Sequence, residues 1–301
     1  MKTCEIRIRD PFVVTDHEAG LYYLYGTTDT DPWHGQGEGF SVYTSPDLVE
    51  WEGPFGAFTP PAGFWATHHF WAPEVHFYDG AWYMFASFKS DLRPRGVQIL
   101  RAESPLGPFV PISDGPITPE EWECLDGTFY CDAEGTPWLV FSHEWIQIHD
   151  GAICRMPLTK DLRAVSGPPS ELFTASQSGW SVQGTGSVIQ LPGTNYVTDG
   201  PYLYHMADGS LGMLWSSYAV TGYAVGLAKS RSGDLAGPWK HEPHPLSDQD
   251  GGHAMLFRTM DGSLMMTLHR PNESPEERPV FLPVAEENGR LILKQEEKSD
   301  A

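Results

Sequence analysis

The sequence predicts an all-β fold, specifically a five-bladed β-propeller. One observation is a unit that recurs five times along the 301 residues: a polar residue, an apolar strand, a tight turn and a second apolar strand. Another is the abundance of turn-forming residues, 31 Gly and 26 Pro, as expected of many short strands. A period of roughly 50–70 residues with several strands per unit is typical of propeller blades.

The five units follow one another without a low-complexity linker. Each is a β-hairpin whose turn is either an Asp-Gly pair or a short loop between apolar strands. Four units then end in a Gly-Pro sequence that closes the unit. The sequence therefore predicts one domain over residues 1–301, with blades at residues 9–55, 70–113, 125–175, 197–246 and 252–294.

Each unit begins with a polar side chain. A β-sandwich with many hairpins is the alternative fold, but it does not require such a residue at every start. In a propeller the innermost strand of each blade starts near the central axis, so the starts of all blades converge there. Carboxylates gathered at one axis repel each other, so some must be functional, protonated or metal-bound. The five starting residues are Asp10, Glu74, Asp126, Asp199 and His253.

Charge and composition exclude several classes of partner. The formal net charge of -21 disfavours nucleic acids and anionic membranes, which are bound by clustered Lys and Arg. No apolar run reaches the length of a membrane span. The four cysteines form no CxxC pair and Met1–Ile6 opens no apolar signal sequence, so we expect free thiols and a cytoplasmic protein. A neutral oligosaccharide remains compatible with this surface.

Several short motifs resemble the ordered motifs of glycoside hydrolase family 43. The resemblance covers residues 9 to about 283, and the order of the motifs makes it more specific than any one of them. The motifs are Arg9-Asp10-Pro11, Trp71-Ala72-Pro73-Glu74, Asp126 after Leu125, Asp199-Gly200-Pro201-Tyr202, Gly252-His253 and Glu277-Arg278-Pro279-Val280-Phe281.

The resemblance implies a five-bladed propeller that hydrolyses arabinofuranosides, xylosides or related glycosides with inversion and requires no cofactor. It implies that Asp10 is the general base and that Asp199 holds the position of the general acid. It further implies that Asp126 orients this acid and tunes its pKa, and that Arg278 contacts the sugar. His253 would face a structural calcium ion or a water cluster on the axis.

The chemistry of inverting hydrolysis agrees with these residue roles. Inverting hydrolysis needs one ionised and one protonated carboxyl group about 6.5–9.5 Å apart, with water between the base and the sugar. Repulsion from Asp126 would raise the pKa of the acid. Neighbouring residues of a strand point to opposite faces, so we expect no ion pair between Arg9 and Asp10.

Asp199 departs from the family pattern, because the acid is usually Glu. Asp is shorter by about 1.5 Å, a length to which catalytic geometry is sensitive. Three alternatives follow: Asp199 still serves, Glu144 takes over as the acid, or the site binds sugar without cleaving it. His69 and Trp71 precede a blade start, so they are the strongest candidates for stacking on the sugar at the rim.

The expected function is exo-acting removal of terminal arabinofuranosyl or similar units from short oligosaccharides. The alternatives are an endo-acting arabinanase, a non-hydrolytic sugar-binding propeller and a retaining enzyme acting on fructosides. The last is disfavoured because such enzymes usually carry Asn before the first Asp-Pro, where this chain has Arg9.

Overall fold

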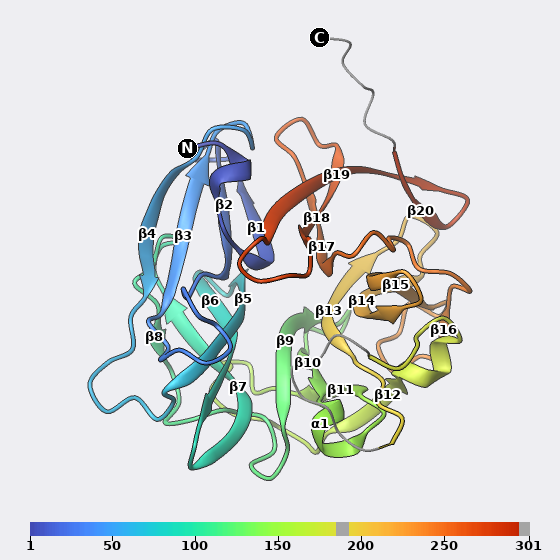
Figure 1. Cartoon of the computed structure of the whole chain (residues 1–301), viewed down its shortest axis with the longest axis horizontal. Coiled ribbons are helices and arrows are strands. Elements are labelled where there is room, and N and C mark those ends of the chain that lie inside the picture. The colour runs from blue at the N-terminus through green and yellow to red at the C-terminus, as the bar shows by residue number, and fades with distance from the viewer. Residues whose placement is uncertain (185–192, 295–301) are drawn as a thin grey trace.

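The computed structural model describes residues 1–184 and 193–294. In these residues, five four-stranded antiparallel sheets stand in a ring around a central axis, as Figure 1 shows. The predicted five-bladed β-propeller is confirmed. Each blade consists of four consecutive strands, and its first strand is the innermost one (Figure 1).

The strands of the five blades have the following bounds. Blade 1 contains β1 (Arg9–Asp16), β2 (Leu21–Thr27), β3 (Phe40–Ser45) and β4 (Glu52–Phe58). Blade 2 contains β5 (His68–Tyr78), β6 (Ala81–Ser90), β7 (Arg93–Ala102) and β8 (Val110–Pro111). Blade 3 contains β9 (Cys124–Cys131), β10 (Pro137–His143), β11 (Ala152–Pro157) and β12 (Ser170–Thr174). Blade 4 contains β13 (Asp199–His205), β14 (Leu211–Ala219), β15 (Gly222–Ser230) and β16 (Trp239–His241). Blade 5 contains β17 (Gly252–Arg258), β18 (Leu264–Arg270), β19 (Arg278–Glu287) and β20 (Arg290–Leu293).

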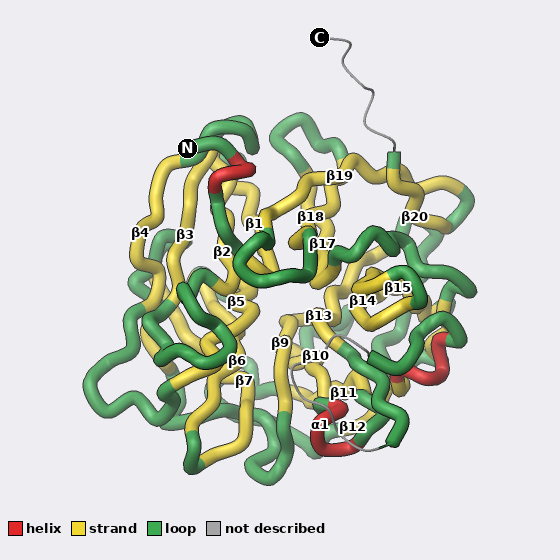
Figure 2. Tube along the Cα trace, viewed as in Figure 1, coloured by secondary structure: helices red, strands yellow, loops and turns green. Residues whose placement is uncertain are grey.

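Helices contribute little to the described residues, and Figure 2 shows them as short segments at the periphery. They are η1 (Thr3–Glu5), α1 (Trp145–Ile148) and η2 (Ala175–Ser178). None of the helices within residues 1–184 and 193–294 has the length and apolar character needed to cross a membrane.

Local turn chemistry sets the hairpins. The β5–β6 turn shows this, because Asp79 and Gly80 have φ values of 45° and 80° while Tyr78 pairs with Ala81. Positive φ at both central residues is the geometry of a type I′ turn, which matches the twist of the strands and favours Asp-Gly. The Asp-Gly signals of the sequence therefore place the strand ends where the register requires them.

Aromatic side chains lock neighbouring blades together. Between blades 1 and 2, the buried rings of Phe40, Phe58, Phe70 and Phe88 pack against each other, with centroids of Phe70 and Phe88 4.9 Å apart at 80°. Edge-to-face pairs of this kind contribute about 0.5–1.5 kcal/mol beyond their buried area. This packing holds the inner strands of separate blades at fixed positions around the axis.

Every inner strand contains a β-bulge close to its start. The bulged residue has a positive φ in all five blades, between 46° and 56°. Each bulge residue directly follows a residue that pairs with the last part of the second strand, at most three positions before that strand ends. The five bulge residues are Asp10, Ala72, Asp126, Gly200 and His253.

The bulges correct two of the predicted blade starts. Ala72 rather than Glu74, and Gly200 rather than Asp199, occupy the positions equivalent to Asp10. Glu74 is buried and its carboxylate lies 3.1 Å from His76 Nε2. Alternating polar and apolar residues do not reveal a bulge, which adds one residue to one strand.

An interblade hydrogen bond, which we term the clasp, fixes each bulge. The acceptor is a side chain near the end of the second strand of one blade. The donor is the backbone N–H of the bulge residue in the next blade. The clasps are Thr27 Oγ1 with Ala72 (2.9 Å), Ser87 Oγ with Asp126 (2.9 Å), Ser216 Oγ with His253 (2.8 Å) and His269 Nδ1 with Asp10 (3.2 Å). The last of these closes the ring between blades 5 and 1.

The clasp between blades 3 and 4 is different. Ser142 stands at the equivalent position, but within the described residues its buried hydroxyl has no hydrogen-bond partner. The N–H of Gly200 instead donates to Asp126 Oδ2 at 2.9 Å. A carboxylate of the site therefore replaces a structural hydroxyl at this one junction.

Candidate active site

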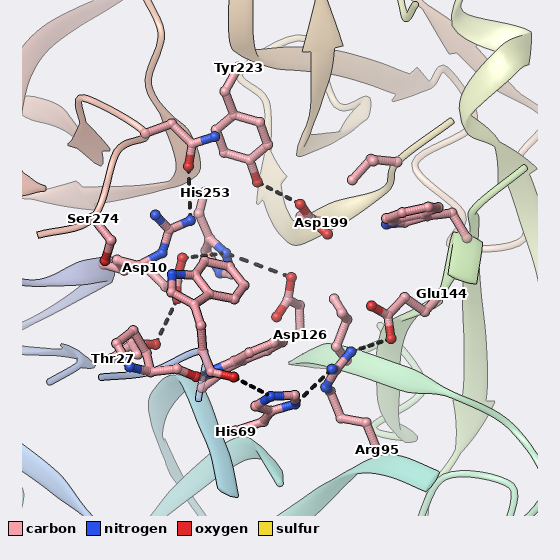
Figure 3. Close-up of a pocket in the computed structure, with 18 of the residues that line it drawn as sticks. Asp10, Thr27, His69, Arg95, Asp126, Glu144, Asp199, Tyr223, His253 and Ser274 are labelled. Carbon is pink, nitrogen blue, oxygen red and sulfur yellow. Dashed lines mark hydrogen bonds and ion pairs between the residues drawn. The ribbon is translucent and has the colours of Figure 1, made fainter. Parts of the chain in front are cut away.

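A cavity of about 680 Å³ lies at the axis and is lined by residues of all five blades. This volume is within the range of small-molecule sites. Of the predicted residues, the cavity contains every catalytic candidate and both rim candidates: Asp10, Asp126, Glu144, Asp199, His253, His69 and Trp71. Figure 3 shows the carboxyl groups of Asp10, Asp126 and Asp199 arranged around one shared space.

Asp10 is held as an anion. Thr27 Oγ1 donates to its Oδ2 at 2.7 Å, and His253 Nδ1 lies 3.2 Å from its Oδ1. Burial acts to raise the pKa of Asp10, but the positive charges of His253 and Arg9 overcome this and hold it well below its usual range. The carboxylate is thus ready to accept a proton at neutral pH.

The bulge also brings Arg9 into the cavity beside Asp10. Both side chains line the cavity although they are neighbours, because a bulge interrupts the alternation of a strand. As expected, no direct ion pair joins Arg9 and Asp10 in the described residues, since Arg9 pairs with Glu277 and Asp10 with His253. The ion-pair partner of Arg9 is the buried Glu277, whose Oε1 lies 2.9 Å from Arg9 Nη1. Arg9 Nη2 donates to Asn272 Oδ1 at 2.9 Å, and its guanidinium carbon lies 5.0 Å from the ring centroid of Trp33.

His253 carries the positive charge of the axis. Its Nδ1 lies 3.2 Å from Asp10 Oδ1 and 3.7 Å from Asp126 Oδ2. Burial lowers its pKa, but the two carboxylates outweigh burial and raise it to about 10. Among the described residues, no three His, Cys, Asp or Glu side chains are placed to share a metal ion, so the calcium ion or water cluster beside His253 stays a prediction.

Asp126, which is buried, and Asp199, which is partly buried, supply the other two carboxyl groups at the blade starts. Asp126 Oδ2 accepts the Gly200 N–H at 2.9 Å, and Asp199 Oδ2 accepts the Tyr223 hydroxyl at 2.8 Å. Burial is the main cause that raises the pKa of both groups above the ordinary carboxyl value. The pair therefore retains a proton at a pH at which Asp10 has none, as acid–base catalysis requires.

The charges that further raise the pKa of Asp199 come from Glu144 and Asp10. Asp126 and Asp199 also repel each other, because the charge of Asp199 raises the pKa of Asp126. In addition, Asp126 accepts a hydrogen bond from the N–H of Gly200, the residue after Asp199. The structure thus offers Asp126 a way to orient the strand that carries Asp199.

Glu144 follows β10 and is paired with Arg95 in the wall of the cavity. Arg95 is only 2% exposed, and its Nη2 lies 2.9 Å from His69 Nδ1. Burial raises the pKa of Glu144, and the Arg95 guanidinium opposes this. A buried guanidinium without a counter-ion is strongly unfavourable, so Glu144 is needed as an anion. This favours Asp199 over Glu144 as the proton donor.

His69 and Trp71 form an aromatic wall together with Trp33. The His69 ring stacks on Trp71 with centroids 4.3 Å apart, and Trp33 meets Trp71 edge-on at 5.1 Å. Trp71 Nε1 donates to the Pro32 carbonyl at 2.7 Å. Burial and Arg95 lower the pKa of His69 to about 3, so its ring is neutral. The aromatic wall is therefore ordered and uncharged before any sugar binds.

Arg278 is not among the residues that line the cavity, so its contact with the sugar stays a prediction without support from this geometry. Its Nε donates to the Cys4 carbonyl at 3.0 Å, and its Nη1 donates to the carbonyls of Pro275 and Glu277. The reason is its position on β19, the third strand of blade 5, away from the axis. Arg9 is the arginine that reaches the cavity beside Asp10.

Sequence reasoning missed Thr27, Arg95 and Tyr223, which contact the three carboxylates Asp10, Glu144 and Asp199. A signal existed for Thr27 only. Thr, Ser or His recurs at the end of each second strand, which is the clasp position.

Comparison with known proteins agrees with this geometry. The model of glycosyl hydrolases family 43 matches residues 3–286. An endo-arabinase from Bacteroides thetaiotaomicron VPI-5482 shares 40% identity over 96% of this chain and 98% of its own, with a TM-score of 0.88. A thermostable family-43 glycoside hydrolase shares 26% identity over 96% and 93%, with a TM-score of 0.79. An endo-1,4-beta-xylanase from Bacteroides thetaiotaomicron VPI-5482 shares 25% identity over 96% and 95%, with a TM-score of 0.78.

Proposed function

The chain belongs to family 43 of the glycosyl hydrolases, and from this premise we propose that it cleaves arabinofuranosyl linkages of oligosaccharides with inversion. The observation that carries the proposal is the pairing of an ionised Asp10 with a proton-retaining Asp199 in one cavity. Two carboxyl groups in opposite protonation states are what inverting hydrolysis requires. Family membership also favours hydrolysis over sugar binding alone.

In the proposed reaction, Asp10 is the general base. It removes a proton from a water molecule while the water oxygen attacks the anomeric carbon. Asp199 is the general acid and transfers its proton to the glycosidic oxygen as the carbon–oxygen bond breaks. Thr27 and His253 hold the Asp10 carboxylate, and Asp126 holds the Gly200 backbone beside Asp199.

Inversion is supported by the place of His253. Its ring lies against Asp10 on one side, with Nδ1 3.2 Å from Oδ1. On the other side, a β-carbon on Gly200 would lie 2.9 Å from the His253 ring. The imidazole thus stands between Asp10 and the backbone that carries Asp199, which supports a wide separation of the two carboxyl groups. Retaining enzymes bring their two carboxyl groups to about 5–5.5 Å.

The sugar is proposed from the relatives. The 40% identical endo-arabinase supports an arabinofuranosyl substrate. The more distant endo-1,4-beta-xylanase supports xylosides as the second candidate. Aryl α-L-arabinofuranoside, β-D-xyloside and β-D-galactofuranoside assayed side by side distinguish these, and we expect the first to have the highest kcat/KM. Release from none of them, at high protein concentration and with arabino-oligosaccharides also intact, would overturn the proposal.

The mode of attack has two candidates. All five blades contribute to the lining of the cavity, which supports attack at a chain end. The name of the 40% identical relative supports attack within the chain. Arabino-oligosaccharides labelled at the reducing end separate the two modes. Early release of arabinose alone indicates exo attack, and early release of labelled fragments of intermediate length indicates endo attack.

The assignment of Asp10 is tested with Asp10→Asn. We expect a loss of at least about 10³-fold in kcat with sugar binding retained, because an amide cannot accept the proton. Turnover near that of the parent protein would remove Asp10 from the mechanism. Proton NMR of the first-formed anomer tests inversion separately, and net retention would exclude it.

A further inference from the structure

One position in the ring of blades lacks the side chain that the others have. The residue before the bulge lines the cavity in four blades, where it is Arg9, Trp71, Leu125 or Asp199. In blade 5 the equivalent residue is Gly252. A β-carbon on Gly252 would lie 2.2 Å from a ring carbon of Tyr223. The Tyr223 ring therefore occupies the space that this fifth side chain would take.

Tyr223 is fixed in this space from several sides. It lies near the start of β15, is 3% exposed, and its ring stacks on His269 with centroids 5.8 Å apart at 24°. Its backbone N–H donates to Asp250 Oδ1 at 3.3 Å, and its carbonyl accepts the Gly251 N–H at 3.0 Å. The ring of a blade 4 residue is thus wedged against blade 5.

The hydroxyl of Tyr223 reaches across to the carboxyl group of Asp199. It donates to Asp199 Oδ2 at 2.8 Å, as the dashed line in Figure 3 shows. Burial and the neighbouring carboxylates raise the pKa of Tyr223 well above its ordinary value, so the hydroxyl keeps its proton. An oxygen that accepts this hydrogen bond acts as the carbonyl oxygen of the protonated acid. The acidic proton then resides on Oδ1.

We propose that Tyr223, seated on Gly252, is the positioning residue of the general acid: it holds Asp199 Oδ2 so that the proton leaves from Oδ1. The inference deepens the proposed function and rests on Asp199 being the acid. When the carbon–oxygen bond breaks, the electron pair stays on the leaving oxygen, which takes the Oδ1 proton. The new Asp199 carboxylate keeps the Tyr223 hydrogen bond. A fixed partner of this kind suits an acid that is one methylene shorter than the Glu usual in the resembled motif.

The first test is Tyr223→Phe, assayed as kcat/KM against pH. The O–H donor favours the ionised form of Asp199, so its removal raises the pKa of the acid and moves the alkaline limb of the profile upward by about one pH unit. The other charged groups that act on Asp199 are His253, Glu144, Asp10 and Asp126, and the variant leaves them in place.

Leaving-group dependence provides a second readout. With a poor leaving group, such as an arabino-oligosaccharide, Tyr223→Phe is expected to lower kcat by about 10-fold to 100-fold, because protonation assists bond breaking. With a 2,4-dinitrophenyl glycoside, which needs no proton, we expect a change of less than about threefold. A merely structural role would slow both substrates alike.

Two further variants sharpen the test. Tyr202→Phe is the matched control, because the Tyr202 hydroxyl also joins blade 4 to blade 5, at 2.8 Å from the Leu256 carbonyl, and lies outside the cavity lining. It should lower the melting temperature without moving the alkaline limb. Gly252→Ala should reproduce the effects of Tyr223→Phe with the hydroxyl still present, because the new methyl group displaces the ring.

The outcomes distinguish the positioning role of Tyr223 from the proposed catalytic role of Asp199. If Tyr223→Phe leaves the alkaline limb unchanged and slows both substrates equally, the positioning role is overturned. The proposed function still stands in that case, provided that Asp199→Asn is inactive on the oligosaccharide. If Tyr223→Phe does not fold, Gly252→Ala decides the same question. Asp199→Asn with full activity on the oligosaccharide would instead overturn the proposed function.

Discussion

Replacement of Thr27 by Val tests whether the clasp supports both the ring and the base. The Thr27 hydroxyl donates to Asp10 Oδ2 at 2.7 Å and accepts the Ala72 N–H at 2.9 Å. It is only 4% exposed, so water cannot replace either bond. Val has nearly the same shape, so the variant removes both hydrogen bonds and leaves the packing in place.

The expected loss of stability follows from these two bonds. A hydrogen bond to a charged group contributes about 1.5–3 kcal/mol, and a buried donor left without a partner costs about 1–3 kcal/mol. We therefore expect the free energy of unfolding to fall by about 3 kcal/mol. For a chain of 301 residues, with an unfolding entropy of about 2 cal/mol/K per residue, this corresponds to a melting temperature lower by about 5 °C.

Activity should fall as well. Without the Thr27 donor, the Asp10 carboxylate loses a bond that favours its ionised form, so the acid limb of kcat/KM moves to higher pH. We expect kcat to fall about 10-fold to 100-fold, because the base is no longer held in place. Calorimetry and pH profiles measure the two effects, and Thr27→Ser should restore most of both.

The matched control is Ser142→Ala at the equivalent position of blade 3. Its hydroxyl has no partner among the described residues, so its removal should change the free energy of unfolding by less than about 0.5 kcal/mol. Equal effects of Thr27→Val and Ser142→Ala, or no effect of either, would refute the clasp as described.

Three further predictions follow from the charges of the site. Glu144→Gln should keep turnover within about 10-fold but lower stability by about 3–5 kcal/mol, because buried Arg95 loses its counter-ion; an inactive but folded variant would identify Glu144 as the acid. His253 has a raised pKa of about 10, so its charge stabilises the fold fully below about pH 6.5 and this contribution is lost as the pH rises through 10. Urea unfolding of His253→Gln should therefore differ most from the parent protein at pH 6 and least at pH 10, and a pH-independent difference would contradict the charge assignment. Arg9→Met should lower stability by about 1–3 kcal/mol, because the buried Glu277 loses its 2.9 Å partner and keeps the 3.8 Å contact with Arg7. Arg278→Met should leave KM unchanged, because its side chain bonds to backbone carbonyls outside the cavity. A raised KM in Arg278→Met would place that side chain on the sugar after all.

The fold was predictable because its information is local. Asp-Gly turns between apolar strands define hairpins within about 20 residues, and their fivefold recurrence defines the ring. Asp10, Asp126 and His253 were recognisable as blade starts because each is a polar residue before an apolar strand, and the structure places each of them at a bulge. Ala72 and Gly200 occupy the same position without a polar side chain, so the sequence predicted the polar residues Glu74 and Asp199 as the starts of their blades instead.

The rest of the site depends on contacts between blades, which periodicity does not encode. Tyr223 acts on Asp199 across a hairpin, and its place depends on Gly252 in the next blade. Arg9 faces the cavity only because a bulge adds a residue to its strand. Neither relation follows from a residue's own neighbours in the chain.

The clasp that closes the ring has a consequence for how the protein is made. Asp10 is synthesised before every other carboxylate of the site, and the partner of its N–H, His269, lies 259 residues later. At a synthesis rate of about 5–20 residues per second, the interval between them is about 13–52 s. During translation the first blades therefore wait with an open edge, and the general base is among the last parts of the site to become ordered. A nascent chain without its fifth blade contains Asp10, Asp126 and Asp199, but it lacks the His269 clasp and the His253 contact that hold Asp10 from the closing side of the ring.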